Sequence, residues 1–540
     1  MNTLLTWARG LAGSLVSGLV IALCATASAA ASYQPLNETC DGLPKLPVGT
    51  MPGTCLGLLA SARSGADFIK PRKALELPRS NQILVTDMGG WSGGKGILWL
   101  LEFSDGSYNR VRGIHKLATG MNLPHDIKLG PDRRIYVGEA NRITRFRLRG
   151  NQMVDRETVV DNLPYTPGSH LHPLTSFVFL PGGDLLVNAG SKTDDCGLSS
   201  VSQTCDELDT TGLRHYRYQP DSNAWDSDFT LYASGLRNSV ALVVHPSGTV
   251  LQGENSTDFK DAEEPYEEIN VIQPGGFYGW PYCFNRRLSV GQGIDQETSG
   301  CDRADYIEPY SLMPPHVAPL DMLYYDGDLL PALKNQLLVS WHGYRVVGNR
   351  LVSYATSADG LPQLVKHVRF NRDPIAPART FTTHTMAPRG GSSADAQHRE
   401  VISKWNKVDG LRPEGAPVGL LQLQDGSLLI VDDKNPALLR LSRGQAYADT
   451  QGDQQLSQID GIHFDGAARE LLLNNCTGCH LELQSNPGEL LNRKDGWLQL
   501  KGGTTLLEQK LTSESGFMPP TGKLESTEIA TILASVAERD

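Results

Sequence analysis

The sequence has 540 residues, with 49 Lys and Arg against 60 Asp and Glu, which gives a formal net charge of -11. An acidic chain of this kind is a poor partner for nucleic acids and for anionic lipid surfaces, because like charges repel. The length is that of several domains, or of one large domain with a smaller one attached.

The N-terminus is typical of a signal peptide. Arg9 precedes the apolar run LAGSLVSGLVIALCA, and small residues follow in TASAAAS. This layout predicts an export signal over residues 1–30 and a periplasmic or secreted protein. The run is too short and too rich in Gly and Ser for a membrane span, and no later stretch reaches the roughly 20 apolar residues that a spanning helix needs. A lipid anchor on Cys24 is the alternative, although Leu23 stands where such a signal needs a small residue.

Six of the nine cysteines fall into pairs that are close in the sequence. Cys24 lies in the signal, and two others belong to a motif near the C-terminus. The remaining pairs are Cys40 with Cys55, Cys196 with Cys205, and Cys283 with Cys301. In an exported chain this spacing predicts three loop disulfides, with free buried thiols as the alternative.

A pattern of strand, tight turn and strand recurs along the first 445 residues. Short β-rich runs start at Asn81, Arg133, Gly183, Gly248, Asn335 and Gly426. Several follow another strand and a turn, as in HDIKLGPDRRIYV and ALVVHPSGTVLQ. This is the pattern of a propeller blade, so residues 31–445 are predicted to form an all-β six-bladed β-propeller, with a β-sandwich as the alternative. Loops on one face of a propeller converge over the central channel, and we expect the functional residues there.

The pattern changes near residue 445. The polar stretch QAYADTQGDQQLSQID predicts a linker over residues 446–460. The segments DGAARELLLNNC and STEIATILASVAERD have helical periodicity, so residues 461–540 are predicted to be a small all-α domain.

The C-terminal segment contains the motif C-x-x-C-H, formed by Cys476, Cys479 and His480. In an exported chain it indicates haem c, bound through both thiols and ligated by His480. A redox dithiol or half of a zinc site are the alternatives, but the sequence has no second C-x-x-C. Met518, in SGFMPPTGKL, is predicted to be the second axial ligand, because no histidine follows His480 and Met ligation suits an electron acceptor. This segment resembles a class I cytochrome c domain.

Polar residues gather in the predicted loops of the propeller. They are His125, His170, His172, Arg237, Asn238, Arg345 and Arg412, together with the acidic run DFKDAEEPYEEIN. No G-x-G-x-x-G opens a βαβ unit, which argues against NAD or a Rossmann flavin. The sequence also lacks a His/Cys cluster typical of a transition-metal site.

Several segments resemble the soluble pyrroloquinoline quinone (PQQ) sugar dehydrogenases, in particular their sorbosone dehydrogenase-like branch. They include PRKALELPRSNQILVTDMGGW, GSHLHPLTSFVFLPGGDLLVNAGSKTDDC, ASGLRNSVALVVHPSGTVLQGENSTD, EEINVIQPGGFYGWPYC and GAPVGLLQLQDGSLLIVDDK. The likeness covers most of residues 65–445. That family is a six-bladed propeller that uses PQQ and calcium to oxidise sugars or aldehydes, so the resemblance implies the same fold, cofactors and chemistry here.

The resemblance also implies roles for single residues around PQQ. His172 matches the general base of the family, with His170 as its local competitor. Arg237 and Asn238 match residues near the reactive quinone oxygen, where a permanent positive charge stabilises a developing oxyanion. Further predicted PQQ contacts are His125, which stands where the family has glutamine, Arg345, and Arg412. Arg412 is considered because Ala416 replaces the family's arginine in GAPVG.

The acidic run matches the calcium-binding loop of that family. The implied ligands and neighbours are Asp261, Glu267, Glu268 and Tyr278. Calcium prefers carboxylate and carbonyl oxygens, and it would act on the quinone as a Lewis acid.

The function predicted from the sequence is therefore an exported quinohaemoprotein dehydrogenase. It oxidises a sugar, polyol or aldehyde by hydride transfer to PQQ and passes electrons to haem c. A soluble cytochrome, a copper protein or a membrane oxidase would be the downstream acceptor. The alternatives are an electron carrier or docking protein without its own substrate, and a calcium-dependent propeller hydrolase of the lactonase type.

Overall fold

The computed structural model describes most of the chain from Tyr33 to residue 446 and short parts after it. The described residues are 33–104, 107–197, 204–259, 264–290, 301, 303–343, 349–365, 394–403, 405, 415–446, 467–468, 471–472, 500–501, 504–512 and 524–537.

Six antiparallel sheets, or blades, follow one another along the chain. Blade 1 contains β5 (Pro71–Leu77), β6 (Gln82–Asp87), β7 (Gly96–Phe103) and β8 (Val111–Met121). Blade 2 contains β9 (Asp126–Leu129), β10 (Ile135–Glu139), β11 (Arg142–Arg149) and β12 (Gln152–Val160). Blade 3 contains β13 (Phe177–Phe179), β14 (Leu185–Ala189), β15 (Gly212–Tyr216) and β18 (Thr230–Ser234), with β22 (Gly276–Phe277) added in parallel at its edge.

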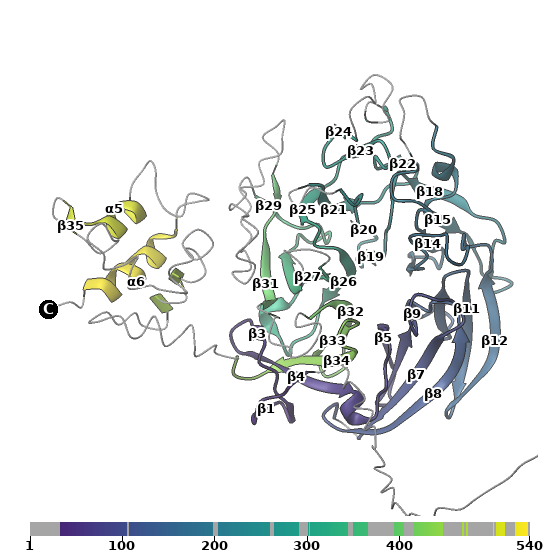
Figure 1. Ribbon diagram of the computed structural model, residues 1–540, viewed down its shortest axis with the longest axis horizontal. Coiled ribbons are helices and arrows are strands. Elements are labelled where there is room, and N and C mark those ends of the chain that lie inside the picture. The colour runs from purple at the N-terminus through teal and green to yellow at the C-terminus, as the bar shows by residue number, and fades with distance from the viewer. Residues whose placement is uncertain are drawn as a thin grey trace, which may run out of the picture. The chain divides into compact units, whose positions relative to one another are not determined.

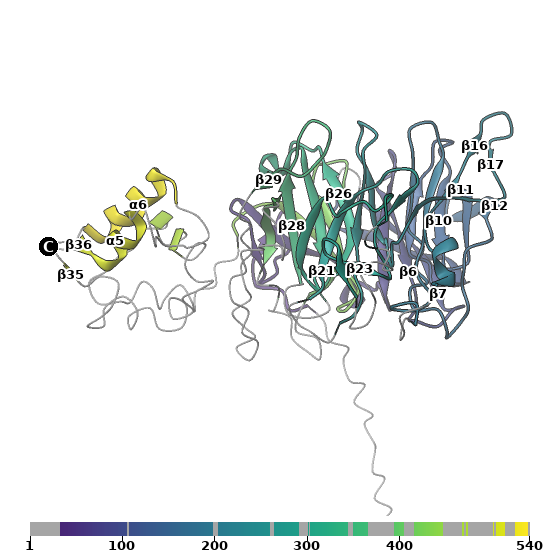
Figure 2. The ribbon, with the colours of Figure 1, turned by 90° about the horizontal axis from the view of Figure 1, so that it is seen from above.

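The other three blades repeat this order. Blade 4 contains β19 (Ala241–Val244), β20 (Val250–Glu254), β21 (Tyr266–Val271) and β25 (Ser311–Pro315). Blade 5 contains β26 (Pro319–Tyr325), β27 (Gln336–Trp341), β28 (Arg350–Ala355) and β31 (His398–Ser403). Blade 6 contains β32 (Pro417–Gln422), β33 (Leu428–Asp432) and β34 (Ala437–Arg443). Figure 1 shows the sheets arranged around a centre, and Figure 2 shows them edge-on.

The N-terminal part of the propeller completes the last two blades. Strand β4 (Thr54–Ser61) pairs with β34 as the outermost strand of blade 6. Strand β3 (Gly49–Thr50) pairs with the edge of blade 5. The first strand of blade 6, β32, contacts the first strand of blade 1, β5, so the ring closes. The prediction of a six-bladed propeller is confirmed.

The blades are held together by apolar side chains between them. Leu98 and Leu100 of blade 1 pack with Ile127, Val137 and Phe146 of blade 2 in one buried cluster. The strands alternate side chains between two faces, so each blade buries one face against each neighbour. Full burial of a Leu, Ile or Phe side chain contributes roughly 1.5–3 kcal/mol, which makes these clusters the main stabilising element.

Buried polar side chains link the first strands of successive blades around the channel. Asp126 accepts a hydrogen bond from the Phe177 amide at 3.0 Å, and Asp321 accepts one from the Leu420 amide at 2.7 Å. Lys73 forms an ion pair with Asp321 in the same region. Because these carboxylates are paired, they fix the blades relative to one another without leaving a buried charge unpaired.

All three predicted disulfides are present. They join Cys40 to Cys55, Cys196 to Cys205, and Cys283 to Cys301. The propeller also has four short hairpins among its described residues: β1 (Thr39–Cys40) with β2 (Leu43–Pro44), β16 (Tyr218–Gln219) with β17 (Ala224–Trp225), β23 (Cys283–Phe284) with β24 (Leu288–Ser289), and β29 (Leu364–Val365) with β30 (Asp395–Ala396). Its described 3-10 turns are η1 (Ala62–Ser64), η2 (Asp206–Asp209) and η4 (Pro331–Leu333).

The C-terminal segment has helices among its described residues. They are α5 (Leu506–Thr512) and α6 (Ser526–Ala537), beside the short hairpin of β35 (Leu500–Lys501) and β36 (Thr504–Thr505). Helix α6 confirms the helix predicted for STEIATILASVAERD, whereas the cytochrome c assignment of this segment stays a prediction. Within the described ranges, no helix has the length and apolar character needed to cross a membrane.

Candidate active site

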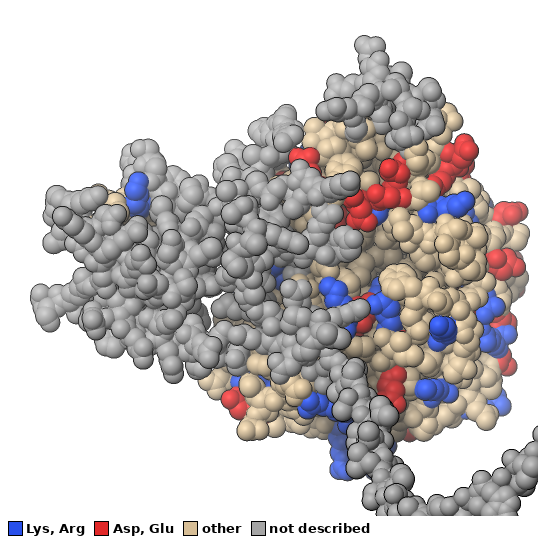
Figure 3. All heavy atoms as spheres, in the orientation of Figure 1, with Lys and Arg blue, Asp and Glu red and all other residues tan. Residues whose placement is uncertain are grey.

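A cavity of about 370 Å3 opens at one end of the channel. Its lining comes from the starts of first strands and the ends of second strands, as with Leu174 before β13 and Asp433 after β33. These chain ends meet on one face because first and second strands are antiparallel. The cavity brings together four predicted residues, His172, Arg237, Asn238 and Glu267. Both signs of charge occur across the described part of the face in Figure 3.

The hydrogen bonds of His172 indicate which of its two ring nitrogens carries the proton. Its Nδ1 lies 3.0 Å from the Ser191 carbonyl and 2.8 Å from Ser191 Oγ. Ser191 Oγ already donates to the Thr193 carbonyl at 2.6 Å, so both Ser191 oxygens act as acceptors. Nδ1 therefore carries the proton, and Nε2 keeps its lone pair for a ligand in the cavity.

The surroundings of His172 keep the ring neutral. Burial lowers the pKa of His172 well below its ordinary value, and the nearby Arg237 charge lowers it further. The chain also packs tightly behind the ring, because a Cβ at Gly190 would lie 2.4 Å from the His172 carbonyl oxygen. The imidazole is thus held in one place as an unprotonated base at neutral pH.

His170, the competing candidate, faces elsewhere. Its Nε2 contacts the Gly190 carbonyl at 3.0 Å, and the residue does not line the cavity. Burial lowers the pKa of His170 as well. Of the two histidines, only His172 lines the cavity.

Arg237 is buried and held from several sides. Its Nε donates to the Asp194 carbonyl at 3.1 Å, and Nη1 donates to the Asn255 carbonyl at 2.9 Å. Nη2 forms ion pairs with the carboxylates of Asp194 and Asp258. The guanidinium is therefore a fixed charge at the cavity wall rather than a mobile surface group.

The Arg237–Asn238 turn rests on one buried carboxylate. Glu254 Oε1 accepts hydrogen bonds from the amides of Arg237 at 2.7 Å and Asn238 at 3.0 Å. Burial raises the pKa of Glu254 to about 7, although these amides act in the opposite direction. Asn238 Oδ1 is buried and has no hydrogen-bond partner among the described residues, which leaves an acceptor for a ligand.

One loop of blade 3 supports both halves of this arrangement. It carries Ser191, which orients His172, and Asp194, which holds Arg237. Glu207 of η2 fastens the loop by accepting from the Lys192 amide at 2.6 Å and from the Thr193 hydroxyl at 2.5 Å. The disulfide from Cys196 to Cys205 spans the same loop.

Three positively charged side chains on the other side of the cavity were not predicted from the sequence. They are Lys70, Arg72 and Lys434, and together they form the cationic group. Asp433 Oδ2 pairs with Arg72 Nη1 at 2.5 Å and with Lys70 Nζ at 3.3 Å, and its Oδ1 contacts His342 Nε2 at 2.7 Å. Burial alone raises the pKa of Asp433, but His342, Arg72 and Lys70 lower it by more, so its pKa lies well below the ordinary value. Lys434 adds another cation. The sequence signal that could have found these residues is charge at blade ends, in KPRK at the start of β5 and DDK at the end of β33.

His125 lies behind this group. Its Nδ1 accepts a hydrogen bond from Arg72 Nε at 3.1 Å, and its Nε2 is buried without a partner among the described residues. Burial, followed by the charges of Arg72 and Lys73, lowers the pKa of His125 well below its ordinary value. His125 does not line the cavity, so it supports Arg72 from behind.

The residues predicted to bind calcium do not all lie at the same site. Glu267 lines the cavity, and its Oε2 accepts from the Ser256 amide at 2.6 Å. Glu268, next along β21, faces the other side and accepts from Asn270 Nδ2 at 3.2 Å. The Tyr278 hydroxyl donates to the Val271 carbonyl at 2.7 Å. Neither Glu268 nor Tyr278 joins Glu267 at the cavity, and the described residues contain no group of three or more His, Cys, Asp or Glu placed to hold a metal ion.

Comparison with known proteins identifies the propeller. Residues 131–352 match the family model described as glucose/sorbosone dehydrogenase. The propeller is therefore similar to this family over residues 131–352. The predicted resemblance to this family is confirmed, and the match supports the predicted class of enzyme, an oxidoreductase of the sugar dehydrogenase type.

Solved structures share the fold of this propeller. A family AA12 carbohydrate-active enzyme of Trichoderma reesei, in a calcium structure, is 20% identical, with a TM-score of 0.55 over 76% of this chain and 99% of that one. The PQQ domain of a pyranose dehydrogenase from Coprinopsis cinerea, in its holo form, is 17% identical, with a TM-score of 0.55 over 75% and 99%.

Curated relatives are matched only in part. An uncharacterised protein of Synechocystis is 36% identical over 66 residues, or 12% of this chain, and one of Borreliella burgdorferi is 31% identical over 116 residues, or 21%. The chain spans only 15% and 30% of the length of these two relatives.

Several predicted site residues lie outside the described part of the chain. They are Asp261, Arg345, Arg412, the haem residues Cys476, Cys479 and His480, and Met518. Their roles stay predictions.

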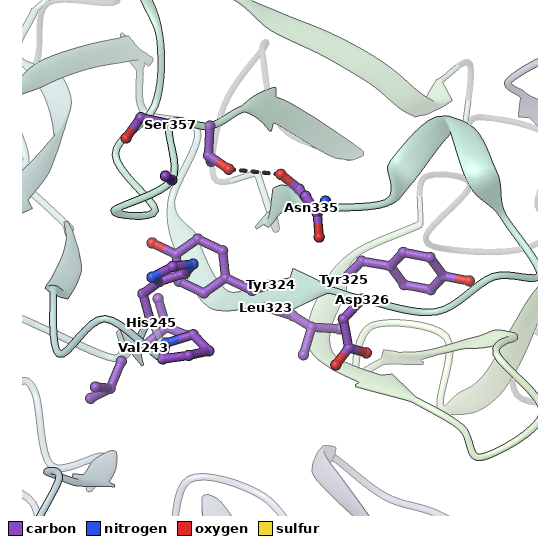
Figure 4. Close-up of a pocket in the computed structure, with 12 residues that line it drawn as sticks. Val243, His245, Leu323, Tyr324, Tyr325, Asp326, Asn335 and Ser357 are labelled. Carbon is purple, nitrogen blue, oxygen red and sulfur yellow. Dashed lines mark hydrogen bonds between the residues drawn. The ribbon is translucent and has the colours of Figure 1, made fainter.

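A second cavity, of about 600 Å3, lies at the opposite ends of the first strands of the propeller, between blades 4 and 5. Figure 4 shows His245 and Tyr324 beside each other in its wall. The Tyr324 hydroxyl donates to the Gly360 carbonyl at 2.7 Å, and Asp326 accepts from Gln422 Nε2 at 2.6 Å. The first contact lies within blade 5 and the second connects blades 5 and 6, and none of the predicted site residues lines this cavity.

Proposed function

We propose that this chain is an exported dehydrogenase that oxidises a sugar, a polyol or an aldehyde with PQQ in the propeller cavity and passes the electrons to haem c on its C-terminal segment. The observation that carries the proposal is the convergence of a neutral His172, a fixed Arg237 and the cationic group in one cavity. The family match over residues 131–352 and the PQQ domain that shares the fold support it.

The residues of the cavity suit PQQ. The cofactor carries carboxylates, and Lys70, Arg72 and Lys434 offer cations to hold them. Arg237 and the unpartnered Asn238 Oδ1 would face its polar edge. A volume of about 370 Å3 is within the range of small-molecule sites.

His172 is the proton acceptor in this proposal. Oxidation of an alcohol or hemiacetal requires the substrate hydroxyl to lose its proton as the neighbouring C–H bond breaks. His172 Nε2 takes that proton, while Nδ1–H stays bonded to Ser191 and prevents the ring from turning. When bound, PQQ supplies an electrophilic carbonyl that accepts two electrons and the hydrogen from carbon. Arg237 stabilises negative charge that develops beside it.

Calcium is proposed to bind near Glu267. Its buried carboxylate lines the cavity, and burial raises the pKa of Glu267 to about 8. A cation at this position would lower that pKa and make the ionised carboxylate favourable. The calcium structure of the Trichoderma reesei enzyme supports the proposal.

The haem proposal depends on the sequence motif C-x-x-C-H and on Met518. Export is supported by the disulfides, because they persist in oxidising compartments. A soluble cytochrome, a copper protein or a membrane oxidase would then receive the electrons.

Reconstitution tests the proposal. Purified protein is treated with a chelator, and PQQ and calcium are added separately and together in the presence of a panel of sugars, polyols and aldehydes. Substrate-dependent reduction of the haem absorption bands only when both are present is the expected result. Hydrolysis of a lactone with calcium alone would favour a hydrolase, and haem reduction only by an added redox protein would favour an electron carrier.

A further inference from the structure

An exposed tryptophan side chain lines the cavity. Among the described residues, six large hydrophobic side chains are exposed: Ile69, Trp91, Leu129, Leu171, Leu364 and Val365. Trp91 lines the cavity and is 61% exposed. Ile69 and Leu171 adjoin in sequence the cavity residues Lys70 and His172. Half of the exposed set therefore either lines the cavity or adjoins a lining residue in sequence, and exposed apolar side chains beside a cavity are typical of binding surfaces.

The structure holds Trp91 in this exposed position. The buried Asp87 accepts hydrogen bonds from the amides of Gly89 at 2.9 Å, Lys70 at 2.7 Å and Ile69 at 2.8 Å. One carboxylate thus joins the loop that carries Trp91 to the segment that carries Ile69. The loop also needs glycine at Gly89, where φ is +65° and a Cβ would lie 2.1 Å from the Lys95 carbonyl oxygen.

The neighbours of Trp91 suit a sugar ring. Lys70 Nζ lies 5.8 Å from the centroid of the indole ring, and Asp258 contributes a half-exposed carboxylate to the cavity lining. A pyranose presents C–H groups on its faces and hydroxyls at its edge. An exposed aromatic face beside hydrogen-bonding groups matches both.

We propose that Trp91 forms an outer saccharide subsite, so that the preferred substrate has at least two sugar rings. The reducing-end ring would occupy the cavity near His172, and the next ring would stack on Trp91 at the mouth. This inference depends on the proposed sugar oxidation and adds the size of the substrate to it.

Steady-state kinetics with glucose, maltose and cellobiose test the subsite. In Trp91→Ala, the KM for the disaccharides should rise about threefold to tenfold relative to the KM for glucose, the range expected for a lost ring contact. The kcat should change little, because stacking acts equally on the bound substrate and the transition state. Trp91→Phe should recover most of the disaccharide affinity.

Leu129→Ala is the matched control, because Leu129 is exposed but lies away from the cavity, beside Arg133. Equal changes of KM for glucose and the disaccharides in Trp91→Ala would overturn the outer subsite. So would slower reoxidation by the electron acceptor with unchanged sugar kinetics, which would indicate a protein-docking patch. If the unaltered protein oxidised none of the three sugars with PQQ and calcium, the proposed sugar oxidation itself would fail.

Discussion

Replacement of His172 by alanine is the most direct test of the site. The substitution removes Nε2, the acceptor that faces the cavity, and leaves Ser191 bonded to Thr193. A positioned general base contributes about 10²–10⁴-fold to a rate. Burial and Arg237 make His172 a weaker base than free imidazole. We therefore expect the loss to lie in the lower part of that range, about 10²–10³-fold.

The pH dependence gives a second measure of the same residue. His172 must be neutral to accept a proton, so the rate should fall only when the pH drops through its lowered pKa. Arg237 contributes to that lowering, so Arg237→Gln should raise the pKa of His172. The acid limb of the rate–pH profile should then move to higher pH, whereas deeper burial of His172 would move it to lower pH.

Stopped-flow single turnovers with PQQ-loaded protein are the assay, read as substrate-driven reduction and followed over pH. His170→Ala is the control and should lose much less. Binding of PQQ to His172→Ala, measured by titration, should stay close to that of the unaltered protein. If His170→Ala is the impaired variant, the assignment of the base is wrong by two residues. If neither variant slows reduction, the hydrogen-bonded base at His172 has no catalytic role.

Other predictions concern the supports of the site, the stability of the fold and the haem. Glu207→Ala should lower kcat/KM by about tenfold or more, because a small misplacement of catalytic groups is costly, and a control thermal scan should show the propeller still folded. Burial raises the pKa of Glu76 from 4.5 to about 7, so its contribution to stability is complete below about pH 4.5 and is lost as the pH rises through 7. The melting temperature should accordingly fall less between pH 5 and pH 8 in Glu76→Gln, and an identical slope would contradict the burial argument. Met518→Ala should keep covalent haem but lower its potential, and an unchanged potential in a redox titration would refute Met518 as a ligand.

Local signals in the sequence were enough for the fold and for part of the site. Each blade hairpin combines a period-two pattern with a tight turn over about ten residues. Hairpins such as β9 with β10 and β32 with β33 can therefore be predicted from the local sequence alone. The disulfides were predicted because each pair is close along the chain. His172, Arg237 and Asn238 were found through family motifs, and the structure places all three at one cavity.

Contacts between distant segments were decided only by the tertiary structure. Arg72 and Asp433 are separated by 361 positions and meet because blade 6 returns to blade 1. The ring closes with β4, a strand that precedes blade 1 in the chain. Glu268 and Tyr278 follow the same motif as Glu267, yet strand alternation and a turn hydrogen bond direct them elsewhere.

The sequence by itself determined what is encoded over short distances: strand periodicity, close cysteine pairs and residue motifs. Only the folded ring decided which nitrogen of His172 carries the proton, because that depends on Ser191 in an adjoining loop. It also decided which cations face a ligand, because Lys70 and Lys434 come from opposite ends of the propeller sequence. These properties arise from packing and shared hydrogen bonds across blades, and no single stretch of sequence contains them.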